Sequence, residues 1–199
     1  TAPDVAEALA GLRALPGGDR LVGIRHQVQG EPDPEWLLRP DVLRGLRAVA
    51  DAGLVYDLLV VPAQLPVAAR AAALVPQLAF VLDHAGKPPV ARRLTHPWAD
   101  DLRALAALPN TVCKLSGLVT EADPRSWTLE DLRPYADTVI DAFGPSRLMF
   151  GSDWPVCLPA APYAVVVDAA RELTGRLGEE GRRAVLAETA CRVYGLRTA

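Results

Sequence analysis

Short apolar runs alternate along the chain with longer stretches of helical periodicity. Runs of strand length cover residues 21–28, 55–61, 79–83, 111–115 and 147–150. Apolar positions at helical spacing cover residues 5–15, 36–52, 66–74, 100–108, 129–143, 163–174 and 179–193. Strands that alternate with helices of this length are typical of parallel βαβ units. The pattern therefore predicts an α/β fold with five parallel strands.

Two of these apolar runs end in ionisable residues followed by Gly or Pro. One reads Leu148-Met149-Phe150-Gly151-Ser152-Asp153-Trp154-Pro155, and the other reads Phe80-Val81-Leu82-Asp83-His84-Ala85-Gly86-Lys87-Pro88. Pro155 ends the first strand because proline cannot donate to a sheet ladder. In α/β barrels the catalytic groups lie at the carboxyl ends of the strands. We therefore expect Asp153 and His84 to face each other across one active site.

At these positions the chain resembles the metal-dependent amidohydrolase superfamily, in the family 2 branch that holds sugar-lactone hydrolases. Three more segments fit the same branch and follow in family order: Gly23-Ile24-Arg25-His26, Cys113-Lys114-Leu115-Ser116-Gly117 and Ala190-Cys191-Arg192-Val193-Tyr194-Gly195-Leu196. The resemblance implies a (β/α)8 barrel of the TIM type. Residues 1–199 would form one partial barrel domain that carries about the last five βα units.

The family opens with a strand that bears a His-x-His pair, and this chain contains no such spacing. Its histidines are His26, His84 and His96. Complete barrels of this type typically need about 250 residues, so we interpret the chain as lacking the first three βα units. On this interpretation residues 1–199 alone would be inactive on lactones and prone to aggregate through open sheet edges. A complete protein of a smaller fold is the alternative.

The resemblance also implies chemical roles for the two strand-end residues. The aspartate that ends the last strand, here Asp153, takes a proton from the attacking water and later delivers it to the leaving group. A histidine in the position of His84 either ligates a metal or polarises the substrate carbonyl. His84 and Asp153 are therefore the candidate metal ligands for one divalent ion, with zinc as the first choice, although some family members work without metal. The implied reaction is the opening of a lactone ring.

Strand periodicity assigns side chains to the two faces of the sheet. In residues 21–28 the odd positions place Arg25 and Gln27 inside the barrel, while His26 points the opposite way and is expected to pack. An inward Arg needs an anion or an oxygen, so Arg25 is a candidate for substrate binding, and a structural salt bridge is the alternative. Gln27 is a further candidate for positioning the substrate ring. Along the strand of residues 79–83, alternation places Phe80, Leu82 and then His84 on the same face. We expect this face to be the inner one.

Further candidates lie at the rim and in the middle of the strands. Lys87 and Trp154 lie within the two strand-end motifs and are expected to contact substrate, with simple packing as the alternative for Trp154. Asp57 and Lys114 occupy mid-strand positions on two different strands. Their opposite charges predict a buried ion pair, which would relieve the penalty of burying either group; direct participation in substrate binding is the alternative.

Composition narrows the class of protein. The chain has 199 residues, is 50% hydrophobic and carries a net charge of −3, so it can bury a core and shows no basic footprint for nucleic acid. It has no apolar run of membrane-spanning length, and its three cysteines without a CxxC pair favour a reducing compartment. We expect a cytoplasmic enzyme with a small-molecule substrate, and leave homo-oligomerisation open.

Two other functions remain compatible with the sequence. One is a decarboxylase of the related amidohydrolase type, which would release carbon dioxide rather than open a lactone. The other is a barrel without catalysis that serves binding or assembly.

Overall fold

Five parallel strands form one sheet in the computed structural model, which describes residues 1–196. The strands are β1 (Gly23–His26), β2 (Val55–Leu58), β3 (Phe80–Leu82), β4 (Thr111–Leu115) and β5 (Leu148–Phe150). They pair in chain order, and every pair is parallel. The predicted α/β fold with five parallel strands is confirmed.

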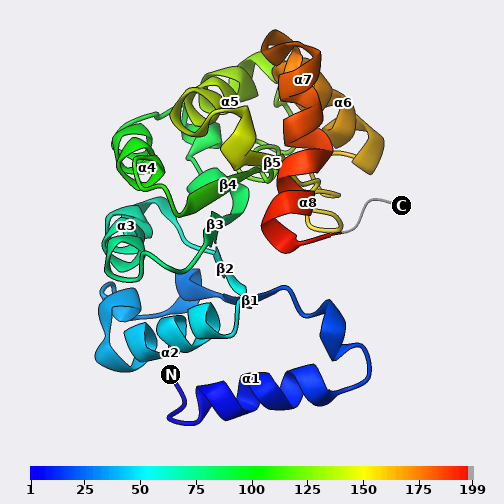
Figure 1. The fold of residues 1–199 in the computed structure, drawn as a ribbon. Coiled ribbons are helices and arrows are strands. Elements are labelled where there is room, and N and C mark those ends of the chain that lie inside the picture. Colours follow the sequence, from blue (N-terminus) through cyan, green and yellow to red (C-terminus); the bar gives the residue numbers. More distant parts are fainter. Residues whose placement is uncertain (197–199) are drawn as a thin grey trace.

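The helices lie on both sides of this sheet. They are α1 (Val5–Ala14), α2 (Pro40–Asp51), α3 (Leu65–Leu74), α4 (Trp98–Ala106), α5 (Leu129–Phe143), α6 (Tyr163–Leu173), α7 (Gly178–Arg183) and α8 (Thr189–Tyr194). Figure 1 shows α2 to α6 following one another in an arc on one side of the strands, with α8 on the other side. A π-helical turn, Ala184–Glu188, joins α7 to α8, so the predicted helix 179–193 is one continuous helical stretch.

One predicted helix begins later than expected. The periodicity of residues 36–52 predicts a single helix, but Trp36–Leu38 form a separate 3₁₀ turn and α2 begins at Pro40. Arg39 has an extended conformation with ψ of 138°. The ring of a proline disfavours helical geometry in the residue before it, which explains why the helix cannot run through Arg39.

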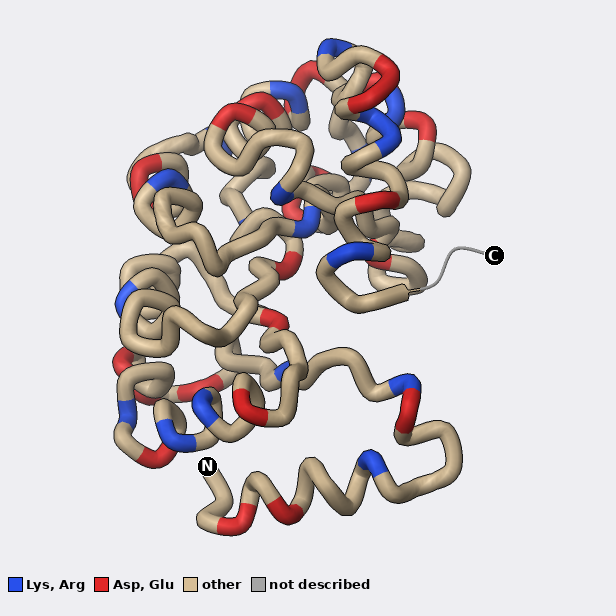
Figure 2. Tube along the Cα trace, in the orientation of Figure 1, with Lys and Arg blue, Asp and Glu red and all other residues tan. Residues whose placement is uncertain are grey.

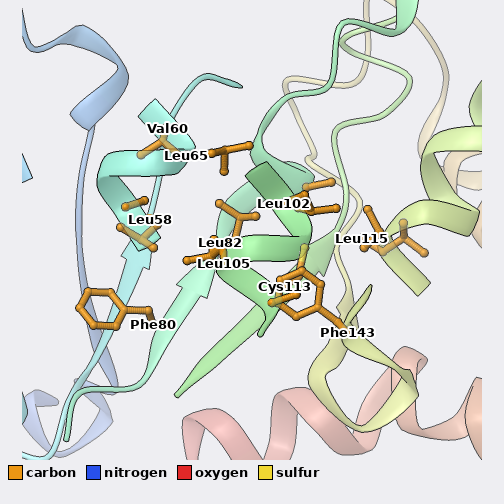
Figure 3. Close-up of a cluster of buried hydrophobic side chains, with 14 of the residues drawn as sticks. Leu58, Val60, Leu65, Phe80, Leu82, Leu102, Leu105, Cys113, Leu115 and Phe143 are labelled. Carbon is orange, nitrogen blue, oxygen red and sulfur yellow. The ribbon is translucent and has the colours of Figure 1, made fainter. Parts of the chain in front are cut away.

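The main hydrophobic core lies between the sheet and the arc of helices. Its strand residues include Leu58, Phe80, Leu82 and Cys113, all of them 0% exposed. Figure 3 shows these side chains gathered with leucines from α3 and α4 and with Phe143 from α5. Because strand side chains alternate between faces, the residues between them must point to the opposite, concave face of the sheet.

The concave face carries an apolar layer and, one strand step above it, a charged one. Val55, Val81, Val112 and Met149 form the apolar layer and pack against Ala190, Val193 and Tyr194 of α8. Two residues further along three of the strands come Asp57, Asp83 and Lys114. The register places Arg25 of β1 directly beside Asp57. The helix α8 thus covers the apolar layer. The charged layer lies beyond it, next to the carboxyl ends of the strands.

Charges on the rest of the molecule are mixed. Figure 2 shows acidic and basic residues interspersed along the helices rather than gathered into a region of one sign. Among the described residues, no helix combines the length and the apolar character that crossing a lipid bilayer requires.

Candidate active site

A strained turn presents His84 at the carboxyl end of β3. The strand ends at Leu82, and His84 and Ala85 both have φ of 52°, the left-handed region that costs a residue with a Cβ roughly 1–2 kcal/mol. Trp98 of α4 donates a hydrogen bond from Nε1 to the carbonyl oxygen of Ala85 at 2.8 Å and so anchors the turn. Strain of this kind persists only where the surroundings hold it, and it is typical of functional sites.

The face assignment made for β3 from the sequence is wrong. Phe80 and Leu82 belong to the core beneath the helices, and Val81 belongs to the concave face. Asp83 is therefore the residue that continues inward, and the sequence reasoning missed it. His84 still reaches the cavity because its left-handed backbone breaks the two-residue alternation on which the prediction relied.

The structure brings His84 and Asp153 together. Nε2 of His84 lies 3.6 Å from Oδ1 of Asp153, and both side chains are largely buried. Nδ1 of His84 is hydrogen bonded to Oγ of Ser116 at 2.9 Å, and Thr120 donates from Oγ1 to Oδ2 of Asp153 at 3.0 Å. In each residue a hydroxyl group holds one polar atom: Ser116 holds Nδ1 of His84, and Thr120 holds Oδ2 of Asp153. The other polar atoms, Nε2 and Oδ1, face each other.

Burial keeps the His84 imidazole neutral. It lowers the pKa of His84 below the usual 6.5, and the positive charges of Lys87 and Lys114 lower it further, against the opposing effect of Asp153 and Asp83. The imidazole is therefore uncharged at neutral pH, and one of its two nitrogens is available as an acceptor.

Gly117 lets the loop after β4 approach His84 closely. A Cβ at this position would lie 2.8 Å from Cβ of His84, and the residue has φ of +69°. Only glycine meets both demands without moving the histidine ring.

The two residues line an open cavity of about 710 Å³ at the carboxyl ends of the strands. All six residues predicted for the site line this cavity: Arg25, Gln27, His84, Lys87, Asp153 and Trp154. Trp154 is 62% exposed, so it is not packed beneath the rim. Lys87 stands 3.5 Å from Glu121 in the loop after β4. His26 points elsewhere and stacks on Trp36 with ring centroids 4.6 Å apart, as the face assignment for this strand predicts.

A network of buried charges forms the floor beneath these groups. Nζ of Lys114 lies 2.5 Å from Oδ2 of Asp57, which confirms the predicted ion pair, and 2.7 Å from Oδ1 of Asp83. Asp83 also pairs with Nη1 of Arg25 at 3.3 Å. Tyr194 of α8 donates from its hydroxyl to Oδ1 of Asp57 at 2.8 Å. The two carboxylates raise the pKa of Lys114 well above its ordinary value despite the burial that opposes them.

His84 and Asp153 fit part of a metal site. Imidazole nitrogen and carboxylate oxygen are donors that zinc accepts, and two ligands at about 2.0–2.1 Å in tetrahedral geometry would lie about 3.3 Å apart. The observed 3.6 Å between Nε2 and Oδ1 is close to that separation. Within residues 1–196, no third His, Cys, Asp or Glu joins them in a metal-binding group. A catalytic zinc usually has three protein ligands, and His84 and Asp153 would supply two of them.

Comparison with known proteins identifies the class. The profile of the amidohydrolase family matches residues 1–196, so the chain belongs to the amidohydrolase family. The L-fucono-1,5-lactonase of Burkholderia multivorans is 44% identical over an alignment of 206 residues. The alignment covers 98% of this chain and 68% of that enzyme.

Solved structures agree with this assignment. A crystal structure of an amidohydrolase from Burkholderia multivorans with bound zinc has a TM-score of 0.92 and 43% identity, and the match covers 98% of this chain and 70% of that one. A putative 2-pyrone-4,6-dicarboxylic acid hydrolase from Pseudomonas putida has a TM-score of 0.74 and 26% identity, with 98% and 69% covered. The predicted α/β fold of the TIM-barrel type is confirmed, with five strands in the described part of the chain.

Proposed function

We propose that this protein hydrolyses a lactone, with Asp153 as the base that activates water. The observation that carries the proposal is the pairing of Asp153 with the neutral His84 at the mouth of the cavity. The 44% identity to a protein named L-fucono-1,5-lactonase supports a sugar lactone as the substrate.

The reaction follows from the free atoms of the pair. Thr120 holds one oxygen of Asp153, and the other can accept a proton from a water molecule as that water attacks the lactone carbonyl. The same carboxyl then passes the proton to the ring oxygen that leaves. Lactone and water together give one hydroxy acid, and Asp153 returns to its starting state.

We assign His84 to stabilise the negative charge that develops on the carbonyl oxygen of the lactone. When Ser116 donates to Nδ1, the hydrogen of the neutral ring resides on Nε2, which can then donate to the carbonyl oxygen as negative charge develops there. The alternative that we propose for His84 is a metal ligand: if Nδ1 carries the ring hydrogen and donates to Ser116, Nε2 of His84 and the carboxylate of Asp153 would be two ligands of a divalent ion, with zinc favoured by the bound zinc in the Burkholderia multivorans structure. When present, such an ion supplies positive charge to the substrate carbonyl.

Four other cavity residues suit the binding of a hydroxylated ring. Arg25 and Gln27 offer hydrogen-bond donors from the end of β1, and Lys87 offers a charge at the rim. The exposed indole of Trp154 gives a flat apolar surface next to the base. We place the reaction in a reducing compartment, the cytoplasm, because the three cysteines are free and two of them are buried.

An assay for ring opening tests the proposal. The full-length protein is mixed with L-fucono-1,5-lactone, and acid release is followed at constant pH. We expect hydroxy acid to form well above the uncatalysed rate, with no carbon dioxide released from an unsaturated carboxylic acid supplied in parallel. A rate equal to that of buffer, or release of carbon dioxide, would contradict the proposal.

Gly117→Ala is expected to lower turnover by roughly 10²-fold, because the added methyl displaces the His84 ring and a misplacement of about 1 Å can have an effect of that size. Gly53→Ala is the matched control, since Gly53 also has a positive φ, +65°, but nothing lies within 4 Å of its Cβ position. Each variant should lose roughly 1–2 kcal/mol of unfolding free energy. Equal kcat values for the two variants would refute the role given to this close contact.

Arg25→Ala is expected to raise KM by about 10-fold or more with little change in kcat, because Arg25 is assigned to substrate binding and not to proton transfer. Steady-state kinetics on L-fucono-1,5-lactone measures both constants. A collapse of kcat at unchanged KM would mean that Arg25 acts on the transition state instead.

A further inference from the structure

Asp83 is a fully buried carboxylate between two cations. Its side chain is 0% exposed, and its two oxygens face different partners, Lys114 at 2.7 Å and Arg25 at 3.3 Å. Oδ1 of Asp83 forms a close ion pair with Lys114. Among the described residues, no donor points at this oxygen with the geometry of a hydrogen bond. A carboxylate in such a place is retained only if its charge is compensated.

The charges of the network balance in pairs. Lys114 and Arg25 are positive, and Asp57 and Asp83 are negative. Lys114 approaches both carboxylates at 2.7 Å or less, so it supplies most of the compensation at short range. Tyr194 of α8 adds a hydrogen bond to Asp57 and keeps that carboxylate turned toward Lys114. Lys114 alone cannot neutralise both carboxylates, so Arg25 completes the charge balance through its contact with Asp83.

Arg25 is bound by only one of its nitrogens. Nη1 makes the single side-chain hydrogen bond of Arg25 found among residues 1–196, and its 3.3 Å length is long for a charged pair. The side chain is 53% exposed and lines the cavity of His84 and Asp153. No other hydrogen bond from residues 1–196 occupies its remaining N–H groups, so as far as the structure describes the chain they are available to a ligand in that cavity.

We propose that Asp83 is a positioning residue that holds Arg25 by one nitrogen, so that the rest of the guanidinium recognises hydroxyl oxygens of a sugar-type lactone. This inference rests on the proposed lactone hydrolysis and deepens it by naming the residue that orients Arg25 toward the substrate. The Asp83 side chain is fully buried, and we assign it to act through Arg25 and not through contact with the substrate. It fixes the direction of Arg25, and the positive charge of Lys114 makes the burial of Asp83 tolerable.

Two lactones separate this role from a merely structural one. L-fucono-1,5-lactone carries ring hydroxyls, whereas δ-valerolactone has none. Asp83→Asn should raise KM for L-fucono-1,5-lactone roughly tenfold and leave KM for δ-valerolactone within about twofold, because only the first substrate has oxygens for Arg25. Asp41→Asn is the matched control: Asp41 also pairs with an arginine, Arg39 at 3.0 Å, but lies on α2 outside the cavity.

A second background tests whether the effect runs through Arg25. In an Arg25→Ala protein, adding Asp83→Asn should change KM no further. If Asp83→Asn alone fails to fold, the charge-balanced double variant Asp83→Asn with Lys114→Met is used, and it should show the same selective rise. An equal rise for both lactones, or an additive effect in the Arg25→Ala background, would overturn the inference.

Binding of the hydroxy acid separates this inference from the proposed function. Calorimetric titration with L-fuconate needs no turnover, and Asp83→Asn should weaken that binding roughly tenfold. If the unmodified protein binds L-fuconate in this Asp83-dependent way but opens no lactone, the proposed function fails and the positioning role stands. If it opens L-fucono-1,5-lactone and Asp83→Asn changes neither KM nor L-fuconate binding, the positioning role fails alone. If it neither binds nor reacts, both fail.

Discussion

Asp153→Asn is expected to lower kcat on L-fucono-1,5-lactone by about 10²–10⁴-fold, the usual effect of losing general-base catalysis. The amide keeps the shape of the side chain but cannot accept the proton of the attacking water. Thr120 can still hydrogen bond to the amide oxygen, so the residue should stay in place. Turnover is measured on the full-length protein, with urea unfolding as the check that the fold survives.

Asp168→Asn is the matched control for this variant. Asp168 lies on α6 with a 72% exposed side chain, it pairs with Arg171 one helical turn away, and neither residue lines the cavity. Its loss should leave kcat unchanged, since exposed pairs contribute little. Near-normal kcat in Asp153→Asn would show that another group removes the proton.

Lys114→Met is expected to lower the free energy of unfolding by about 3–5 kcal/mol, because it leaves Asp57 and Asp83 buried without their shared countercharge. Methionine has a similar volume, so the loss should come from electrostatics and not from a cavity. Urea unfolding at neutral pH measures the difference from the unmodified protein.

The chain offers a natural control, since Lys87 is its only other lysine. Lys87 pairs with Glu121 at 3.5 Å near the rim, where solvent screens the interaction, so Lys87→Met should lose no more than about 1 kcal/mol. Adding Asp57→Leu to Lys114→Met should restore part of the lost stability, because it removes one stranded charge. Similar losses in the two single-lysine variants would contradict the account of the network.

The strands and their order follow from simple patterns in the sequence. Each strand is a short apolar run that a Gly, Pro or polar segment ends, and parallel pairing follows from the helices between the runs. The ion pair of Asp57 with Lys114 was predictable because two opposite charges in apolar strands have few other ways to be buried.

Other parts of the site depend on backbone turns and long-range contacts, which the alternation of side chains along a strand does not predict. The sequence predicts Phe80, Leu82 and His84 on one inner face, but the left-handed turn at His84 breaks the alternation, and this hid the inward position of Asp83. Thr120 reaches Asp153 from a loop 33 positions away, and Tyr194 reaches Asp57 across 137 positions. Contacts of that kind arise from the packing of loops and of α8 onto the sheet, and no local pattern predicts them.

A single-turnover reaction in ¹⁸O-labelled water tests the central claim most directly. Protein in excess over L-fucono-1,5-lactone is quenched after one turnover, and the product and the protein are analysed by mass spectrometry. If Asp153 activates water, one ¹⁸O atom enters the carboxylate of the product, faster than in buffer, and Asp153 stays unlabelled. An unlabelled product with ¹⁸O in Asp153 would show that the carboxylate attacks the carbonyl itself, and formation of product no faster than in buffer would contradict lactone hydrolysis altogether.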